Sequence, residues 1–171
     1  MQAKSCSNSL AVKISHVLPP DTNALGTLFG GRLMAHVDDV AAIAAVRHAR
    51  ESVVTASTDS VDFLHPVKSG DSICVEAFVT WTHQTSMEVF IKAVTEDLLS
   101  GERKVCATAF LTFVAIDGNG RPIPVPAVYP ETKQEKKLHA DAPIRAKHRN
   151  ERRKQSKEMA ATFGTSYPWD R

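Results

Sequence analysis

The chain has 171 residues, of which 43% are hydrophobic and 23% charged, a composition typical of one globular domain with a core of ordinary size. The formal net charge is +2, and no apolar stretch approaches the length that spans a bilayer, so we expect no membrane insertion. The first ten residues lack the apolar core of a secretory signal, and the three cysteines, Cys6, Cys74 and Cys106, form no CxxC pair, so we expect buried free thiols in a cytoplasmic protein.

Charge is divided unevenly along the chain. Residues 1–130 hold 10 Lys+Arg and 13 Asp+Glu, whereas residues 131–171 hold 11 and 6. The basic excess predicts a solvated helical face, with contact to a phosphorylated ligand or an acidic neighbouring subunit as the alternative. No aromatic residues interleave with these charges, so we expect no nucleic acid partner. The predicted organisation is a disordered tail over 1–9, one domain over 10–130 and a basic helical extension over 131–171.

The spacing of apolar residues predicts the elements in chain order. Residues 10–18 alternate as a strand, and residues 30–50 form a helix that is apolar nearly all round, which is typical of a buried helix. Four more strands are predicted over 53–64, 73–81, 87–93 and 105–116, followed by a proline-rich linker and a polar helix over 131–159. Short turns predict antiparallel neighbours, so the fold class is α+β, with a five-stranded antiparallel sheet wrapped around the apolar helix.

The loop over 20–31 and the start of the helix carry the candidate chemistry. Backbone N–H groups at Gly30 and Gly31 open the helix and can hold an oxygen that gains negative charge. Asp38 projects from an apolar helix face, where a carboxylate is costly unless it has a role. Asn23 can orient a water without itself being charged.

Each candidate has a structural alternative. In these alternatives, Asp38 would pair with a buried donor, Asn23 would cap a turn, and the two glycines would serve helix–sheet packing. His36 has Asp39 three residues away, which predicts a structural salt link on a polar stripe of the helix. The other histidines show no metal-ligand spacing, and there is no GxSxG motif, so we expect neither a metal nor a serine triad.

Several ordered segments within residues 10–155 agree with one known family. They are residues 20–31, 34–38, 54–59, 63–70, 86–89, 125–126, 130–132 and 135–137. In these segments the chain resembles the acyl-CoA thioesterases of the hot-dog fold, in the group of broad-specificity and brain-type acyl-CoA hydrolases.

The resemblance implies hydrolysis of acyl-CoA to free fatty acid and CoA, with CoA as part of substrate and product and no separate cofactor. It also implies a homo-oligomer in which a dimer is the catalytic unit and three dimers form a hexamer. The active site then lies between two subunits, with Asp38 from one and Asn23 from the other.

The hypothesis for the mechanism assigns Asp38 as general base on water, with direct attack by the carboxylate as the less favoured variant. The N–H of Gly31, with Gly30 or Phe29 nearby, polarises the thioester carbonyl. Two other functions remain open on this fold, a hydro-lyase and an acyl-CoA-binding sensor. A hydro-lyase normally needs a histidine base beside an acidic partner.

The CoA moiety needs contacts for its phosphates and its pantetheine arm. The candidates are polar residues of the strand at the subunit seam, polar residues of one hairpin, and three basic residues. The alternative is that these side chains are simply solvated. They are Ser57, Thr58, Asp59, Thr85, Ser86, Arg47, Arg50 and Lys137.

Overall fold

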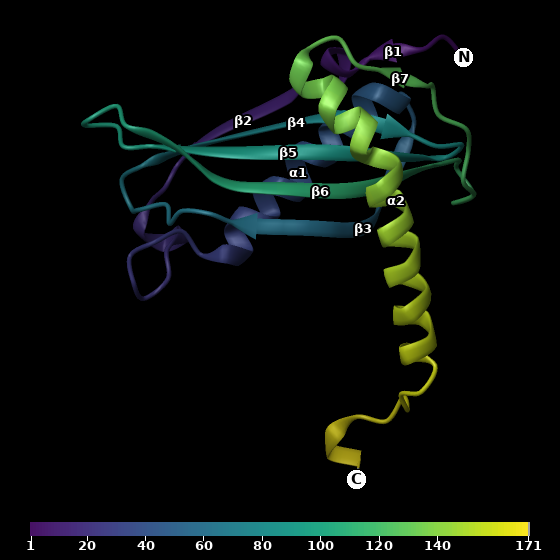
Figure 1. Ribbon diagram of the computed structural model, residues 1–171. Coiled ribbons are helices and arrows are strands. Elements are labelled where there is room, and N and C mark those ends of the chain that lie inside the picture. The colour runs from purple at the N-terminus through teal and green to yellow at the C-terminus, as the bar shows by residue number, and fades with distance from the viewer. Residues whose placement is uncertain (171) are drawn as a thin grey trace.

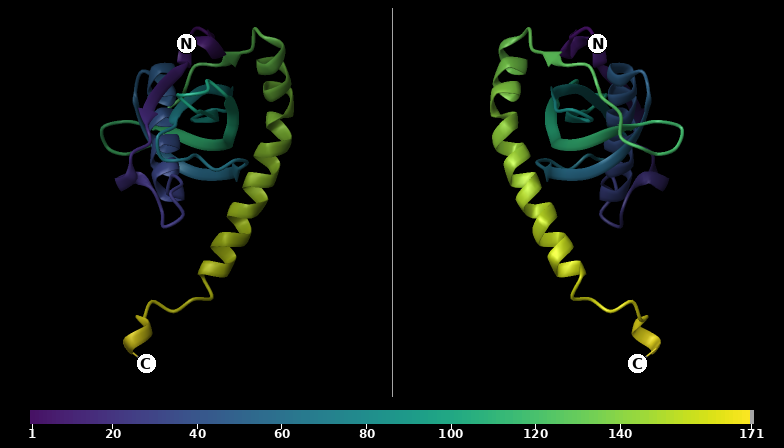
Figure 2. Two further views of the ribbon diagram at one scale, coloured as in Figure 1. Left: turned by 90° about the vertical axis from the view of Figure 1, so that its left-hand side faces the viewer. Right: turned by 90° about the vertical axis from the view of Figure 1, so that its right-hand side faces the viewer.

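In the computed structural model, which describes residues 1–170, an antiparallel sheet separates two long helices (Figures 1 and 2). Helix α1 (Gly30–Ala49) lies against one face and helix α2 (Lys133–Ala160) crosses the other. The five strands are β2 (Ala11–His16), β3 (Ser52–Phe63), β4 (Ser72–Thr82), β5 (Ser86–Glu96) and β6 (Arg103–Ile116). The predicted α+β fold, a five-stranded antiparallel sheet around one apolar helix, is confirmed.

Small side chains allow α1 to lie close to the sheet. Val40, Ala41, Ala44 and Ala45 are fully buried, and Val37 is nearly so. Alanine also has the highest helix propensity, so the same residues that permit close packing favour the helix itself. The small buried side chains therefore set a short distance between the backbone of α1 and the strands.

The strand order is β2-β4-β5-β6-β3, which differs from the expectation that every pair of successive strands is adjacent. Strands β4, β5 and β6 are neighbours as predicted, but β3 pairs with β6 at one edge of the sheet. Residues 64–71 then carry the chain from that edge to β4, which lies beside β2 at the other. This connection is too long to be a tight hairpin, and it places β3 at the end of the sheet with one edge open.

Strand β3 is irregular. Its pairing with β6 shifts between Thr55 and Ser57 and again between Thr58 and Ser60. Each shift inserts one extra residue, a β-bulge, which locally changes the face to which side chains point. The alternation of side chains in a regular strand therefore does not hold in the middle of β3.

The N-terminal segment is ordered where the sequence predicted a disordered tail. Strand β1 (Lys4–Ser5) pairs in parallel with β7 (Val128–Tyr129), and a 3₁₀ helix, η1 (Cys6–Ser9), follows. Ser9 is buried and its hydroxyl accepts a hydrogen bond from the N–H of Val79 at 2.8 Å. The polar character of the segment misled the prediction because its serines bond within the protein. Ser9 bonds to backbone groups of Cys6 and Val79, and Ser7 bonds to the side chains of Ser5 and Glu131.

Two further short 3₁₀ helices complete the chain, η2 (Pro19–Asp21) and η3 (Pro168–Asp170). Helix α2 begins with a capping box formed by Thr132 and Glu135 and continues past the sheet, as Figure 1 shows. Neither α2 nor any other helix of residues 1–170 combines the length and apolarity needed to cross a membrane.

The cysteines are free, as predicted. Burial raises the pKa of Cys6 to about 12 and that of Cys106 to about 11, whereas Cys74 is only half-buried and its pKa is raised for the same main reason. Because the thiolate is the reactive form, we expect Cys6 and Cys106 to remain unmodified by a maleimide at pH 8 and to react fully in denaturant. Intact-mass spectrometry counts the adducts; modification of both residues in native protein would contradict the buried placement.

Candidate active site

The carboxylate of Asp38 is exposed and held from one side. The hydroxyl of Thr55 on β3 donates a hydrogen bond to Asp38 Oδ1 at 2.9 Å. No other hydrogen bond reaches this carboxylate within residues 1–170, so Oδ2 is free to accept a proton. The partner of Asp38 is therefore not a buried donor, because both Asp38 and Thr55 are exposed to solvent.

Thr55 is the residue that the sequence analysis missed. It lies within the segment 54–59 that carried the family resemblance, but strict alternation would place it on the same face as Ser57. The bulge after Thr55 separates them: Thr55 contacts α1, whereas Ser57 contacts Arg152 of α2 at 2.9 Å. The bulge is therefore what brings a hydroxyl to Asp38.

The N-terminus of α1 presents unpaired N–H groups. The N–H groups of Gly30 and Gly31 have no acceptor in the described part of the chain, as expected for the first turn of a helix. Phe29, suggested by the sequence as a further donor, has its N–H bonded to the carbonyl of Asp21 at 2.9 Å. No acidic residue occupies the first turn, so the positive end of the helix dipole is left for an incoming oxygen.

A side chain at Gly31 would displace the ring of Phe29. A Cβ at Gly31 would lie 2.5 Å from Cε1 of the Phe29 ring, whereas a Cβ at Gly30 would meet nothing closer than Phe63 at 3.8 Å. A shallow groove of about 490 Å³ runs beside Gly31 and Ala35, one helical turn before Asp38. Gly31, Ala35 and Asp38 share one helix face because they are spaced four and three residues apart.

Asn23 organises its own loop. Its Oδ1 accepts hydrogen bonds from the N–H groups of Leu25 at 2.9 Å and Thr27 at 3.3 Å, and its Nδ2 donates to Thr27 Oγ1 at 3.0 Å. The turn-capping alternative is thus realised. The amide has a second N–H, and Asn23 is exposed, so it retains the capacity to donate outward.

His36 lacks the acidic partner that the sequence predicted. Asp39 pairs with Lys13 at 2.7 Å, and Asp21 pairs with Arg32 at 3.0 Å. Burial, followed by the positive charges of Lys13 and Arg32, lowers the pKa of His36. A neutral imidazole without a carboxylate partner does not form the dyad that a hydro-lyase would need.

The predicted CoA contacts are dispersed. Ser57 and Asp59 bond to α2, and Ser86 lines a cavity of about 190 Å³ between the sheet and α2, so these three lie across the sheet from Asp38. Arg47 donates to the carbonyl of Leu10, and Arg50 ends α1 in the left-handed conformation at φ 60°. The carbonyl of Thr85 accepts from the N–H of Ala115, and Thr58 and Lys137 are exposed.

No group of three or more His, Cys, Asp or Glu residues within 1–170 is arranged to hold a metal ion. The chemistry available at the site is that of one carboxylate, a hydroxyl, an amide and the N–H groups that open α1.

Comparison with known proteins assigns the family. A model of the thioesterase superfamily matches residues 25–102. An acyl-CoA thioester hydrolase of Bacillus subtilis, YkhA, itself uncharacterised, is 52% identical over 168 residues, which cover 98% of both chains. The chain belongs to the thioesterase superfamily, and within it to the acyl-CoA hydrolases of the hot-dog fold.

Two solved structures are similar over nearly their whole length. A hexameric acyl-CoA thioesterase aligns with a TM-score of 0.87 and 47% identity, covering 89% of this chain and 97% of that one. The acyl-CoA hydrolase of Staphylococcus aureus, solved with butyryl coenzyme A, coenzyme A and coenzyme A disulfide, aligns with a TM-score of 0.89 and 45% identity, covering 93% and 97%.

Alanine variants of the Staphylococcus aureus enzyme have also been solved. The replaced residues are an asparagine, an aspartate 15 positions later and a threonine 17 positions after that. Asn23, Asp38 and Thr55 have the same residue types at the same two intervals. Asn23 and Asp38, selected from the sequence, and Thr55, identified from the structure, thus correspond in type and spacing to the residues replaced in that enzyme.

The glycine pair provides a matched test of the N-terminus of α1. We expect Gly31→Ala to lower the rate of thioester hydrolysis by about tenfold or more, because the new Cβ displaces the Phe29 ring and crowds the N–H that would bind the carbonyl. Gly30→Ala, whose Cβ has room, is the control. Both variants should remain folded, since alanine favours helix. Equal rates for the two variants in a steady-state assay would contradict this role for Gly31.

Proposed function

We propose that this protein hydrolyses acyl-CoA to a free fatty acid and CoA, with Asp38 as the general base. One observation carries the proposal: an exposed carboxylate on α1, held by Thr55 at one oxygen and free at the other. The family assignment supports the reaction class, and the variants of the Staphylococcus aureus enzyme support the choice of residues. CoA is part of the substrate and product, and the mechanism needs no further cofactor.

The proposed reaction needs an activated water and a site for negative charge. Asp38 Oδ2 removes a proton from a water whose oxygen bonds to the thioester carbon. The electrons of the carbonyl double bond move to its oxygen, which the N–H groups of Gly30 and Gly31 stabilise. When the C=O bond re-forms, the C–S bond breaks, and the thiolate of CoA leaves and takes up the proton. The second amide N–H of Asn23 donates to the water or to the carbonyl oxygen.

A single chain does not present these groups to one substrate. In an α-helix the N–H bonds point towards the N-terminus, so those of Gly30 and Gly31 point away from Asp38, which lies about 10 Å further along the axis. A carbonyl bound at these N–H groups therefore lies beyond the reach of the Asp38 of the same helix. A second copy of the chain must supply either the carboxylate or the N–H groups.

The edge of the sheet offers a surface for that second copy. Strand β3 is hydrogen-bonded on one side only, to β6, and Val54 and Phe63 on it are exposed apolar residues. Because Thr55 lies on this strand, pairing there would place Asp38 near the second chain. The hexameric state of the similar thioesterase supports a homo-oligomer, which we propose is a trimer of dimers with the dimer as catalytic unit. The free cysteines support a cytoplasmic location.

Replacement of the base tests the assignment. We expect Asp38→Ala to lower kcat by about a hundredfold or more, because the water loses its proton acceptor. Asp39→Ala removes the neighbouring carboxylate, which pairs with Lys13, and should leave kcat within about twofold. Thiol release from an acyl-CoA measures both. A folded Asp38→Ala protein with near-normal turnover would exclude Asp38, and absence of thiol release by the wild type would favour a sensor.

Mixing of inactive variants tests the shared site. Asp38→Ala and Asn23→Ala are co-expressed with different tags. If each site takes Asp38 from one chain and Asn23 from the other, mixed dimers have one intact site of two, and random pairing restores about a quarter of wild-type activity. The two variants expressed separately give the baseline. Activity equal to the mean of the separate variants would place both residues of a site in one chain.

A further inference from the structure

We propose that Asp59, anchored by Arg149 and Arg152 of α2, is a positioning residue for the Thr55–Asp38 pair. This inference rests on the proposed function of Asp38. It gives the basic C-terminal helix a part in catalysis that does not require contact with substrate.

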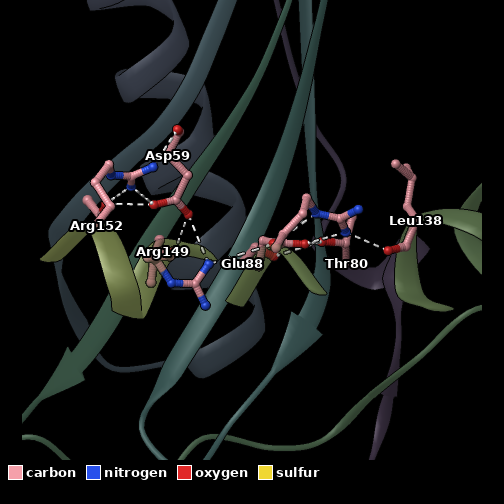
Figure 3. Close-up of polar contacts among 9 residues, drawn as sticks. Asp59, Thr80, Glu88, Leu138, Arg149 and Arg152 are labelled. Atoms are coloured by element: carbon pink, nitrogen blue, oxygen red, sulfur yellow. Dashed lines mark hydrogen bonds and ion pairs between the residues drawn. The ribbon is translucent and has the colours of Figure 1, made fainter. Parts of the chain in front are cut away.

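Asp59 is almost completely enclosed by donors (Figure 3). Its side chain is 9% exposed, and Arg149 Nη1 lies 2.9 Å from Oδ2. Arg152 reaches both Oδ1 at 2.7 Å and the main-chain carbonyl of Asp59 at 2.8 Å. Thr112 Oγ1 donates to Oδ2 at 2.7 Å, and Ser57 Oγ donates to Oδ1 at 2.6 Å. Each carboxylate oxygen therefore accepts two hydrogen bonds.

These contacts coincide with the irregular part of β3. The two bulges lie between Thr55 and Ser57 and between Thr58 and Ser60, so Asp59 lies within the second and its partner Ser57 directly follows the first. Bulges lack regular ladder hydrogen bonds, and β3 is an edge strand, so β6 alone does not determine the path of these residues. The side-chain bonds of Asp59 and the bond from Arg152 to its carbonyl supply the missing constraint.

The constraint reaches the candidate active site through the backbone. The first bulge is what turns Thr55 towards α1 while Ser57 turns towards α2. Loss of the anchor would allow the strand to return towards regular pairing, and a slip of one residue moves a side chain to the other face. Thr55 would then no longer hold Asp38 Oδ1, and the carboxylate would become free to rotate.

This inference replaces the earlier expectation for Ser57 and Asp59. The sequence assigned them to CoA binding, but in the structure their side-chain oxygens are occupied by each other and by Thr112, Arg149 and Arg152. A buried carboxylate that accepts four hydrogen bonds has no site left for a phosphate, which it would also repel.

The test is the variant Asp59→Asn with Glu88→Gln as its matched control. An amide at position 59 presents an NH₂ group to two donors, whichever way it is oriented. Glu88 on β5 is a fully buried carboxylate beneath the same helix, bonded to Arg145 at 2.7 Å and to Thr80 at 2.8 Å. It also lies 3.7 Å from Arg149, which binds Asp59 more closely at 2.9 Å. Both variants weaken a buried contact between α2 and the sheet. Only Asp59→Asn alters a residue of the bulged strand itself, whereas Glu88→Gln leaves the bonds of Asp59 to Arg152, Ser57 and Thr112 in place.

We expect Asp59→Asn to lower kcat by about tenfold or more while KM for the acyl-CoA changes by less than about twofold, because misplacement of the base affects the reaction more than binding. Glu88→Gln should keep kcat near the wild-type value. In a Thr55→Val background, Asp59→Asn should add little, because its effect passes through Thr55. Melting temperature and size-exclusion elution establish that each variant is folded and assembled.

Three results would overturn the inference. A raised KM with unchanged kcat in Asp59→Asn would make it a CoA contact. Equal losses of kcat in Asp59→Asn and Glu88→Gln would mean that both variants act only through general stability. Additive effects of Asp59→Asn and Thr55→Val on kcat would mean that Asp59 does not act through Thr55. Failure of the proposed function is separate: full activity of Asp38→Ala refutes the base, whereas inactive Asp38→Ala with fully active Asp59→Asn refutes only the positioning role.

Discussion

The close packing of α1 against the sheet is the constraint on which the rest of the molecule depends. Fully buried alanines at positions 41, 44 and 45 bring the helix backbone near the strands. Only at that separation can a side chain as short as Asp38 accept a hydrogen bond from Thr55 on the edge strand. Larger side chains on the buried face would move the helix outward and break this contact before they unfolded the domain.

The same helix carries two reactive features that point in incompatible directions. Its N-terminal N–H groups point outward along the axis, and its carboxylate projects sideways two turns later. This division explains why the proposed reaction requires two chains and why an edge strand beside the carboxylate remains unpaired in one chain. Assembly then becomes a condition for activity, since neither feature alone both activates water and stabilises the developing charge.

Much of this arrangement could be predicted from the sequence. The apolar helix, the five strands and the isolated carboxylate Asp38 follow from local composition and spacing, because burial and periodicity act over short stretches. The position of β3 at the sheet edge and the role of Thr55 could not be predicted in this way. Both depend on pairing with β6, about 55 residues later in the chain, and on bulges that have no signature in the side-chain pattern of β3.

The basic residues of α2 include an exposed group, as predicted for a solvated face, and a second group whose partners the sequence did not predict. Their excess over residues 131–171 predicted a solvated face, a phosphorylated ligand or an acidic neighbouring subunit. Arg145, Arg149 and Arg152 instead neutralise Glu88 and Asp59 on the sheet of the same chain. Because an unpaired buried carboxylate is strongly destabilising, the acidic sheet and the basic helix require each other. Helix α2 therefore supplies the positive charges that the buried carboxylates of the sheet need.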